Sequence, residues 1–239
     1  MTATDPWVDL LAGDRALLDR TSTAERVADV LRQRIVEGLL RPGTRLSEES
    51  AGRALAVSRN TLREAFRLLV HERLLVHEFH RGVFVRVLTA DDVADLYRIR
   101  RMLETAALRG AGDAGAARIA AVDAAVTAGE RAAAERRWLD VGTANMRFHQ
   151  AIAGLAGSQR VDEIMRQLLA ELRLAFHVMA RPEEFHAPYL DRNREITGLL
   201  TRGALAEAER RLEEYLDVAE AQLVGAFRRL EAGEGQTAR

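Results

Sequence analysis

Apolar residues in the first part of the chain recur every three or four positions, which is the spacing of one helix face. Thr21-Ser22-Thr23 followed by Glu25 is typical of a helix start, because hydroxyl and carboxylate groups cap the unpaired amides of a first turn. Arg41-Pro42-Gly43 then predicts a turn. The face of this first helix that we expect to be buried consists of Val27, Val30, Leu31, Ile35 and Leu39.

Two more helices are predicted after this turn. Ser47 is a favourable N-cap for a short helix with Glu48 and Glu49 in its first turn, where the helix dipole favours negative charge. The next helix runs from about Ser58 to His71. Its inward face consists of Leu62, Ala65, Phe66 and Leu69.

Alternating apolar residues then predict two short strands, near Leu74–Phe79 and Val83–Leu88. His80-Arg81-Gly82 joins them, and Gly82 supplies the backbone freedom that a tight hairpin needs. Three helices followed by a hairpin predict a winged helix-turn-helix. A hairpin alone fits any small β-ribbon, but its position directly after an arginine-bearing helix favours a wing that touches DNA.

From Thr89 onward the pattern is helical and contains no convincing strand. Breaks fall near Gly110–Gly115, Gly154–Ser158, Arg181-Pro182 and Arg202-Gly203, which predicts roughly six helices in an all-α bundle. The predicted fold class is therefore mainly α, with a winged helix-turn-helix at residues 21–88 and an all-helical domain at 89–231. Residues 1–20 form a leader that is either disordered or packed on the body, and 232–239 form a flexible tail.

The charge distribution is typical of a protein with one nucleic-acid-binding part. The chain has 239 residues, 48% of them hydrophobic, and a net charge of −1, which argues against a general polyanion binder. Residues 21–88, however, hold twelve Arg against eight Asp and Glu, a net of +4. A basic domain joined to a mildly acidic body is expected when only one part meets nucleic acid.

Several classes of protein are disfavoured by the composition. The absence of Cys excludes disulfides, thiolate metal sites and cysteine nucleophiles. No apolar run approaches the length of a membrane span, and the N-terminus is acidic where a signal peptide would be basic, so we expect a cytoplasmic protein. The chain also lacks a Gly-rich phosphate loop and a Gly-x-Ser-x-Gly motif, which argues against an enzyme.

The start of the third helix carries the candidate DNA-reading residues. Ser58 caps the helix, and its first turns present Arg59, Asn60, Thr61 and Arg63. Guanidinium groups and short polar side chains on a helix N-terminus suit the major groove, where they meet base edges and phosphates. The sequence therefore indicates a DNA-binding regulator.

Three blocks of sequence resemble the GntR family of bacterial transcription regulators. They are IVEGLLRPGTRLSEES (Ile35–Ser50), LAVSRNTLREAFRLLVHERLL (Leu55–Leu75) and HRGVFV (His80–Val85). The helical remainder, with DLYRIRRMLETAA (Asp95–Ala107) and Phe148-His149, is similar to the FadR-type branch, whose effector domain is called FCD.

This resemblance implies a homodimer, more often a repressor than an activator, that binds a two-fold symmetric DNA operator. A small molecule in the helical domain, expected to be a carboxylate, then alters DNA affinity. The DNA contacts of the family carry over to Ser58, Arg59, Asn60, Thr61 and Arg63, and to Arg81 and Gly82 in the wing. The family often has Arg where this chain has Glu49, so one contact is expected to be missing or replaced.

Many FCD proteins bind a divalent metal through an Asp and three His. The resemblance places these positions at Asn145, His149, Asn193 and Tyr215, so only one good ligand remains. Three interpretations stay open: a retained metal, an ordinary buried histidine, or a metal-free pocket in which the four side chains bind an organic ligand directly. We favour the last, with no metal and no cofactor, because converging buried polar groups need partners.

Arg100 falls where the family carries an arginine facing the same cavity. It would either bind a ligand carboxylate in a two-pronged manner or form an ion pair with Glu104, one turn on. Alternative functions are a metal-dependent FCD sensor, a helical enzyme with an accessory DNA-binding module, and a ligand-free scaffold. The scaffold would require apolar pocket positions, and these positions are polar.

Overall fold

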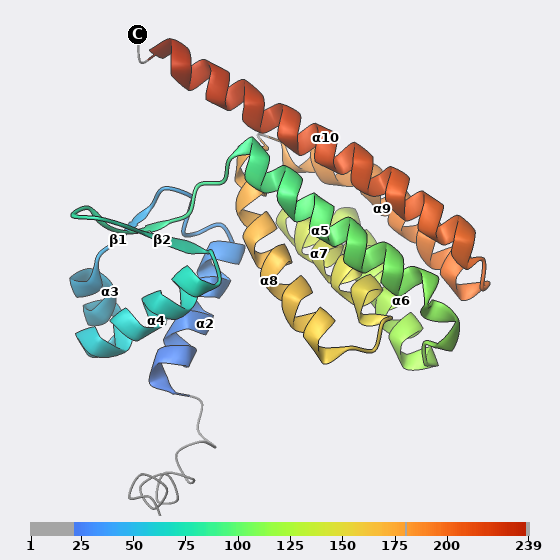
Figure 1. Cartoon of the computed structure of the whole chain (residues 1–239), viewed down its shortest axis with the longest axis horizontal. Coiled ribbons are helices and arrows are strands. Elements are labelled where there is room, and N and C mark those ends of the chain that lie inside the picture. Colours follow the sequence, from blue (N-terminus) through green and yellow to red (C-terminus); the bar gives the residue numbers. More distant parts are fainter. Residues whose placement is uncertain (1–21, 180, 238–239) are drawn as a thin grey trace, which may run out of the picture.

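The computed structural model of the protein describes residues 22–179 and 181–237, which form an N-terminal domain and a larger helical bundle (Figure 1). The leader predicted at residues 1–20 lies outside the described residues. The mainly helical fold class is confirmed, and within the described part of the chain no strand follows Val85.

The three helices of the N-terminal domain are α2 (Thr23–Val36), α3 (Glu48–Leu55) and α4 (Arg59–His71). Each begins after a serine, and the hydroxyl of that serine accepts a hydrogen bond from a backbone amide three residues on. These bonds satisfy amides that a first turn leaves unpaired. The predicted caps at Ser47 and Ser58 are therefore confirmed.

The buried face of α2 is narrower than the sequence predicts. Val27, Leu31 and Ile35 are buried, but Val30 and Leu39 are 43% and 67% exposed. Val30 turns away from the core side of the helix, and Leu39 lies beyond the last helical residue, so the periodicity no longer places its side chain.

A small antiparallel sheet completes this domain. β2 (Leu75–Glu78) and β3 (Gly82–Val85) form the predicted hairpin, and β1 (Arg45–Leu46) pairs with the other side of β3. Both hairpin strands are shorter than predicted. The sequence does not predict β1 either, because a two-residue strand has no alternation to detect and depends on its pairing with β3.

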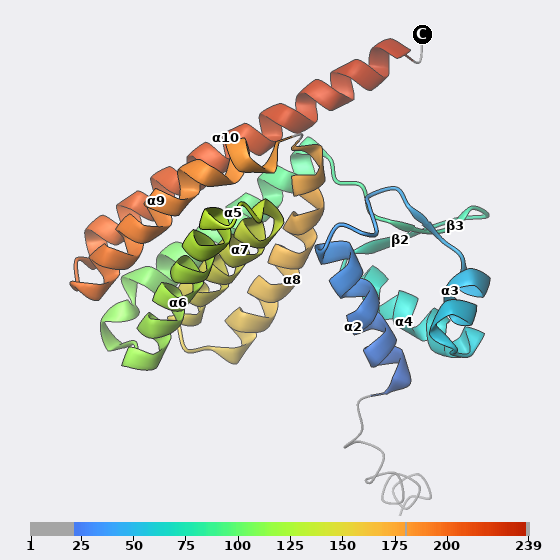
Figure 2. The same cartoon turned by 180° about the vertical axis from the view of Figure 1, so that it is seen from behind.

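The bundle contains six α-helices within the described residues. They are α5 (Ala90–Arg109), α6 (Ala116–Ala134), α7 (Trp138–Gly154), α8 (Gln159–Ala175), α9 (Pro182–Thr201) and α10 (Leu205–Thr237), with 3-10 turns η2 (Ala111–Asp113) and η3 (Phe176–Val178). None of the helices described here is both long and apolar enough to cross a membrane. Figure 2 shows α10 running past the end of the bundle, and its helix extends into the segment 232–239 that the sequence assigns to a tail.

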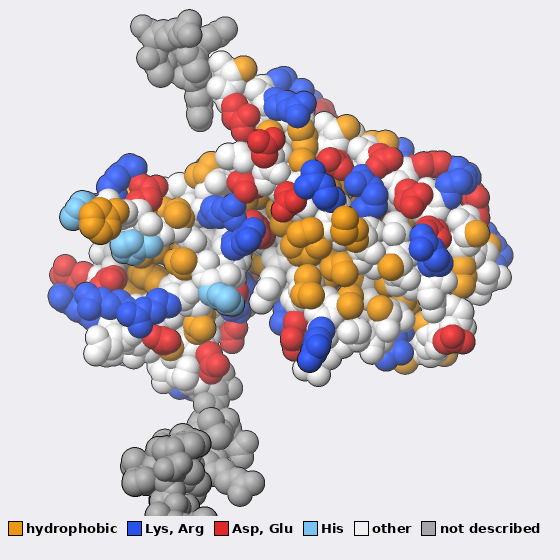
Figure 3. Space-filling view, in the orientation of Figure 1, with side chains coloured by type: hydrophobic (Ala, Val, Ile, Leu, Met, Phe, Trp, Pro, Cys, Tyr) orange, Lys and Arg blue, Asp and Glu red, His pale blue; other side chains and the backbone are white. Residues whose placement is uncertain are grey.

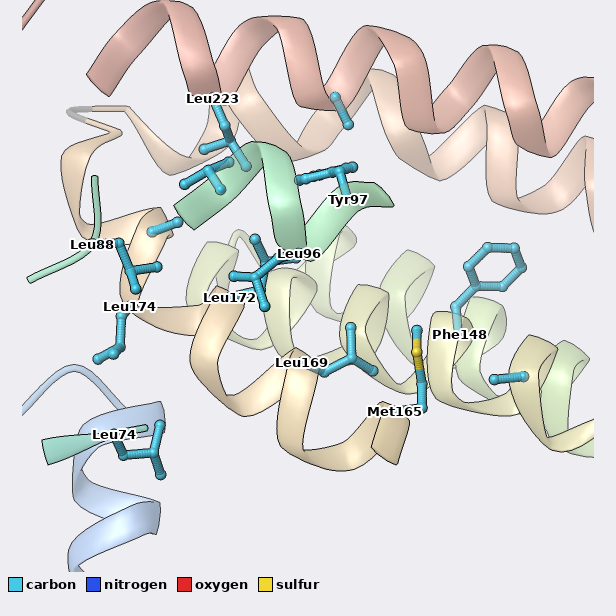
Figure 4. Close-up of a cluster of buried hydrophobic side chains, with 14 of the residues drawn as sticks. Leu74, Leu88, Leu96, Tyr97, Phe148, Met165, Leu169, Leu172, Leu174 and Leu223 are labelled. Carbon is cyan, nitrogen blue, oxygen red and sulfur yellow. The ribbon is translucent and has the colours of Figure 1, made fainter. Parts of the chain in front are cut away.

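The two domains share one continuous hydrophobic cluster. Figure 4 shows Leu74 of the N-terminal domain near Leu174 of α8, with Leu88 of the connection between the domains above them. Charged groups add to this junction: Arg86 forms ion pairs with Asp92 of α5, at 2.7 Å, and with the largely buried Glu171 of α8. Helix α8 is therefore the part of the bundle that holds the N-terminal domain.

Candidate DNA-binding surface and effector site

The first turn of α4 presents two exposed polar side chains to solvent. Ser58 and Thr61 are engaged with each other, since their hydroxyl oxygens lie 2.8 Å apart and the Thr61 amide donates to Ser58 Oγ at 3.1 Å. Arg59 and Asn60 are exposed. Two of the predicted contact residues, Ser58 and Thr61, therefore stabilise the start of the helix. The other two, Arg59 and Asn60, are left at the surface.

Arg63, one turn further along α4, is held by the neighbouring helix. Its Nε donates to Oε2 of Glu48 on α3 at 2.9 Å, while 57% of its side chain stays exposed. Glu49 pairs with Arg53 at 2.8 Å. The acidic side chain at the position where the family often has Arg is thus engaged within α3.

The wing carries the remaining predicted residues. Arg81 is exposed, pairs with Glu78 at 2.5 Å, and its guanidinium carbon lies 5.4 Å from the centre of the Phe84 ring. Gly82 has a φ of +111°, which side chains other than glycine rarely tolerate. A Cβ at this position would also approach Nε of Arg45 at 3.4 Å.

Arg45 and Phe79 are candidate contact residues that sequence reasoning missed. Arg45 lies on β1, the strand that the sequence did not predict, and its guanidinium lies beside the wing. Phe79 follows β2 at the tip of the hairpin and is 81% exposed. For Phe79 the available signal was its position as the last residue of a predicted strand, directly before the turn, where an apolar side chain has no core to enter.

A cleft of about 460 Å³ lies between the helices and the wing. Its lining includes Arg45, Glu48, Glu49, Arg59, His77 and Gly82. Figure 3 shows arginine and histidine side chains gathered on this domain, on the left of the view. The cleft therefore joins the predicted recognition helix and the predicted wing into a single polar surface.

A second group of polar side chains lies deep in the bundle. Nε of Arg100 on α5 donates to Oε1 of Glu104 at 2.9 Å, and Oε2 of Glu104 lies 2.6 Å from Nδ1 of His149 on α7. All three residues are at most 1% exposed. The predicted ion pair between Arg100 and Glu104 is thus present, and it extends to His149.

The charges in this group balance. Burial alone would raise the pKa of Glu104, but His149 and Arg100 lower it below its usual value, so the carboxylate is ionised at neutral pH. Burial lowers the pKa of His149, and Glu104 only partly opposes this effect, so the imidazole is neutral. Nδ1 of His149 therefore carries the proton and donates a hydrogen bond to Glu104, which leaves a lone pair on Nε2.

The other predicted ligand residues meet beside this group. Oδ1 of Asn145 on α7 accepts hydrogen bonds from Nδ2 of Asn193 on α9, at 2.7 Å, and from the hydroxyl of Tyr215 on α10, at 3.0 Å. The rings of Tyr215 and His149 are in edge contact, with centroids 4.9 Å apart. The structure therefore brings together all five residues, from four helices.

We call Arg100, Glu104, Asn145, His149, Asn193 and Tyr215 the polar cluster. Three buried atoms in it have no hydrogen-bond partner among the residues that the structure describes. They are Nη2 of Arg100, Nε2 of His149 and Oδ1 of Asn193. Buried polar atoms are nearly always paired, and leaving one unpaired costs about 1–3 kcal/mol. These unpaired atoms lower the stability of the fold, so their presence indicates a site that binds a ligand.

Comparison with known proteins identifies the family of both the N-terminal domain and the helical bundle. Residues 23–85 match the gntR family of bacterial regulatory proteins, and residues 95–218 match the FCD domain. The chain belongs to the GntR family. It is thus a DNA-binding transcription regulator of the FadR-like branch, in a family whose members are not enzymes.

Individual relatives agree with this assignment. The chain is 42% identical over 88 residues to a gluconate operon transcriptional repressor of Bacillus subtilis, and 34% identical over 140 residues to the Nta operon transcriptional regulator of Aminobacter aminovorans. These matches span 37% and 56% of this chain, and only 36% and 64% of the relatives. A solved putative GntR regulator from Rhodococcus sp. RHA1 is 46% identical with a TM-score of 0.82, over 86% of this chain and 99% of that one.

The polar cluster of this GntR protein does not fit the divalent metal that many FCD domains bind. No three His, Asp or Glu side chains gather as metal ligands within residues 22–179 and 181–237. In the cluster, His149 offers one lone pair, but two donors already occupy Oδ1 of Asn145, and the positive charge of Arg100 opposes a cation. The carboxylate of Glu104 is already paired with Arg100 and His149, so one nitrogen is left where a tight divalent site requires several anionic or nitrogen ligands.

Glu104 is the member of the cluster whose role the sequence did not identify. Its spacing from Arg100 predicted an ion pair along α5, which the structure contains. The contact with His149 joins positions 45 residues apart and depends on how α5 packs against α7. A helical pattern alone contains no signal for it.

Proposed function

We propose that this protein is a ligand-responsive repressor that binds a two-fold symmetric operator as a homodimer. A small organic acid binds the polar cluster of the FCD domain and changes the affinity for the operator. The protein acts in the cytoplasm, where bacterial operator DNA lies. The names of the two operon regulators to which the chain is similar support a role in controlling an operon.

The exposed pair Arg59 and Asn60 on the first turn of α4, which shares a cleft with Gly82 of the wing through Arg59, carries the DNA-binding part of this proposal. In this arrangement Arg59 and Asn60 read base edges in the major groove, while Ser58 and Thr61 fix the helix start. The ion pair with Glu48 holds the side chain of Arg63 in position, and Gly82 lets the wing backbone approach DNA closely. One such domain covers only a half-site, which supports a homodimer on a symmetric operator.

The unpartnered atoms of the polar cluster support a carboxylate effector. Nη2 of Arg100 donates to one oxygen of the ligand carboxylate, in addition to its existing pair with Glu104. A second ligand oxygen meets Nε2 of His149 once that nitrogen takes up a proton. Oδ1 of Asn193 accepts a hydrogen bond from a hydroxyl or amino group of the ligand, and Asn145 and Tyr215 complete the site.

Selection from a library of random DNA duplexes tests the DNA part. We expect the wild-type protein to enrich an inverted repeat whose half-sites lie about one helical turn, ~34–36 Å, apart or a multiple of it. The Arg59→Ala variant is expected to lose this enrichment. Enrichment of no motif, or of one without two-fold symmetry, would contradict the proposal.

The selected duplex then serves to find the effector. Small carboxylates are screened for those that release the labelled duplex from the wild-type protein. We expect a releasing acid to have no effect on His149→Ala, whose DNA affinity is unchanged because the two sites lie in separate domains. Release that is equally strong from His149→Ala would place the effector elsewhere.

A further inference from the structure

A cleft of about 240 Å³ lies at the junction of the two domains, apart from the polar cluster. One wall comes from Arg32 and Val36 of α2, and the other comes from α7 and α8. Its apolar lining includes Val36, Met146, Leu169 and Ala170. We call it the junction cleft.

The junction cleft is surrounded by arginines without an acidic side chain in its lining. Of these arginines, Arg32 is neutralised by Glu72, at 2.6 Å, and by Asp29. For Arg147 and Arg166, the described part of the chain offers no carboxylate within ion-pair distance. The surface of the cleft is almost wholly apolar, so the arginines line it with their methylene groups, and the exposed Arg147 and Arg166 add positive charge at its rim.

Arg173 makes this charge unusual, because its guanidinium is buried. The residue is 5% exposed, and it donates from Nε to the carbonyl of Val36 at 2.8 Å and from Nη2 to the carbonyl of Leu139 at 3.3 Å. Among the residues described, no carboxylate lies within 4.0 Å of it, and burial lowers its pKa below the usual value. Backbone carbonyls supply partial charge only, and the charge of Asp140 offsets the cost of burying this cation only in part, since the pKa of Arg173 stays below its usual value.

We infer that the junction cleft is a binding site for a small amphipathic organic anion. The anionic group lies at the rim beside Arg147 and Arg166, and a hydrocarbon or aromatic body lies against Val36, Met146 and Leu169. Guanidinium groups provide the paired donors that a carboxylate or sulfonate accepts. The bound anion contacts both α2 and the bundle, so it stabilises the packing of the two domains against each other.

This site is separate from the proposed effector site. Both use α7, but Asn145 and His149 face the polar cluster inside the bundle, whereas Met146, Arg147 and Gln150 line the junction cleft. The helical repeat places these two sets on different sides of the helix. The inference therefore stands without the effector site.

The fluorescent sulfonate 1-anilinonaphthalene-8-sulfonate is a suitable probe, because it combines an aromatic body with one negative charge. We expect saturable fluorescence enhancement with the full-length protein. In Arg147→Glu/Arg166→Glu the dissociation constant is expected to rise at least about tenfold, given the strength of hydrogen bonds to charged groups. The matched control, Arg131→Glu/Arg228→Glu, makes the same charge change on α6 and α10 and is expected to bind like the wild type.

Further variants and ligands localise the probe. Arg147→Gln/Arg166→Gln removes the charge without reversing it, and we expect it to weaken binding while its circular dichroism matches the wild type. Phenylacetate should displace the probe, and phenylacetamide, which has the same shape without charge, should not. The inference is overturned if the probe does not bind, if both arginine pairs weaken it equally, or if His149→Ala abolishes its binding.

Discussion

Glu104 and His149 meet across α5 and α7, with 2.6 Å between Oε2 of the carboxylate and Nδ1 of the ring. Because Glu104 is ionised and His149 is neutral, the shared proton stays on Nδ1. The free lone pair of Nε2 is left in the interior beside Tyr215. This pair fixes which tautomer the proposed effector meets, and it makes effector binding sensitive to pH.

Effector affinity should rise as pH falls. The lowered pKa keeps His149 neutral in the free protein, whereas a ligand carboxylate at Nε2 favours the protonated ring, so binding takes up a proton. Between the two pKa values the affinity gains about tenfold per pH unit. Calorimetric titration of an identified effector at several pH values checks this. In His149→Gln the dependence should be absent, and a flat profile in the wild type would contradict proton uptake.

The stability of the protein should fall in mild acid because of His186. Burial and the neighbouring Arg173 lower the pKa of this histidine from 6.5 to about 4. At neutral pH both the folded and the unfolded states hold it uncharged. As pH falls below 6.5 only the unfolded chain takes up the proton, so folding loses up to roughly 3 kcal/mol by pH 4.

Denaturant unfolding of His186→Gln at pH 7 and pH 4.5 measures this contribution. The variant should lose less free energy of unfolding between these pH values than the wild type does. His71→Gln, which changes an exposed histidine of α4, is the matched control and should behave like the wild type. An equal loss in wild type and His186→Gln would refute the role of His186.

Substitutions of Arg59 and of Arg81 should weaken DNA binding in different ways. Arg59→Ala should weaken specific operator binding by roughly 1–3 kcal/mol, because Arg59 is proposed to read a base. Arg81→Ala should weaken all duplexes alike and reduce the slope of log affinity against log salt by about one unit. Fluorescence anisotropy over a range of salt concentrations separates the two. Arg98→Ala, an exposed arginine of α5, is the control, and wild-type affinity in Arg59→Ala would disprove the groove contact.

Chelation should leave the protein unchanged. The polar cluster lacks the ligands for a tight divalent site, so treatment with EDTA is expected to alter neither the melting temperature nor the effector response. Asn145→Asp/Asn193→His/Tyr215→His restores the four-ligand set and should gain metal affinity. Stoichiometric zinc, nickel or manganese in unmodified protein, purified without added metal, would favour the metal-dependent sensor instead.

The protein should be a dimer in solution. A symmetric operator requires two recognition helices on successive faces of the major groove, and a single chain supplies one. Light scattering at micromolar concentration should give twice the chain mass of 26.5 kDa. A mass near one chain would rule out the proposed mode of operator binding.

Local sequence determined much of the molecule. The serine caps at Ser47 and Ser58 and the apolar face of α4 predicted helices that the structure contains at those places. These features depend on residues within a turn or two of each other, so spacing and capping chemistry suffice to locate them. The convergence of His149, Asn193 and Tyr215 also followed from the sequence, although only through resemblance to a family.

The tertiary structure alone decided the contacts between distant segments. β1 exists because Arg45 and Leu46 pair with β3, Glu104 meets His149 because α5 packs against α7, and Arg173 reaches the carbonyl of Val36 because α8 lies against α2. Helical periodicity shows which face of each helix is apolar, but not which helix will cover it. Long-range partners are set by the packing of whole elements, and the charge balance of both proposed ligand sites depends on those partners.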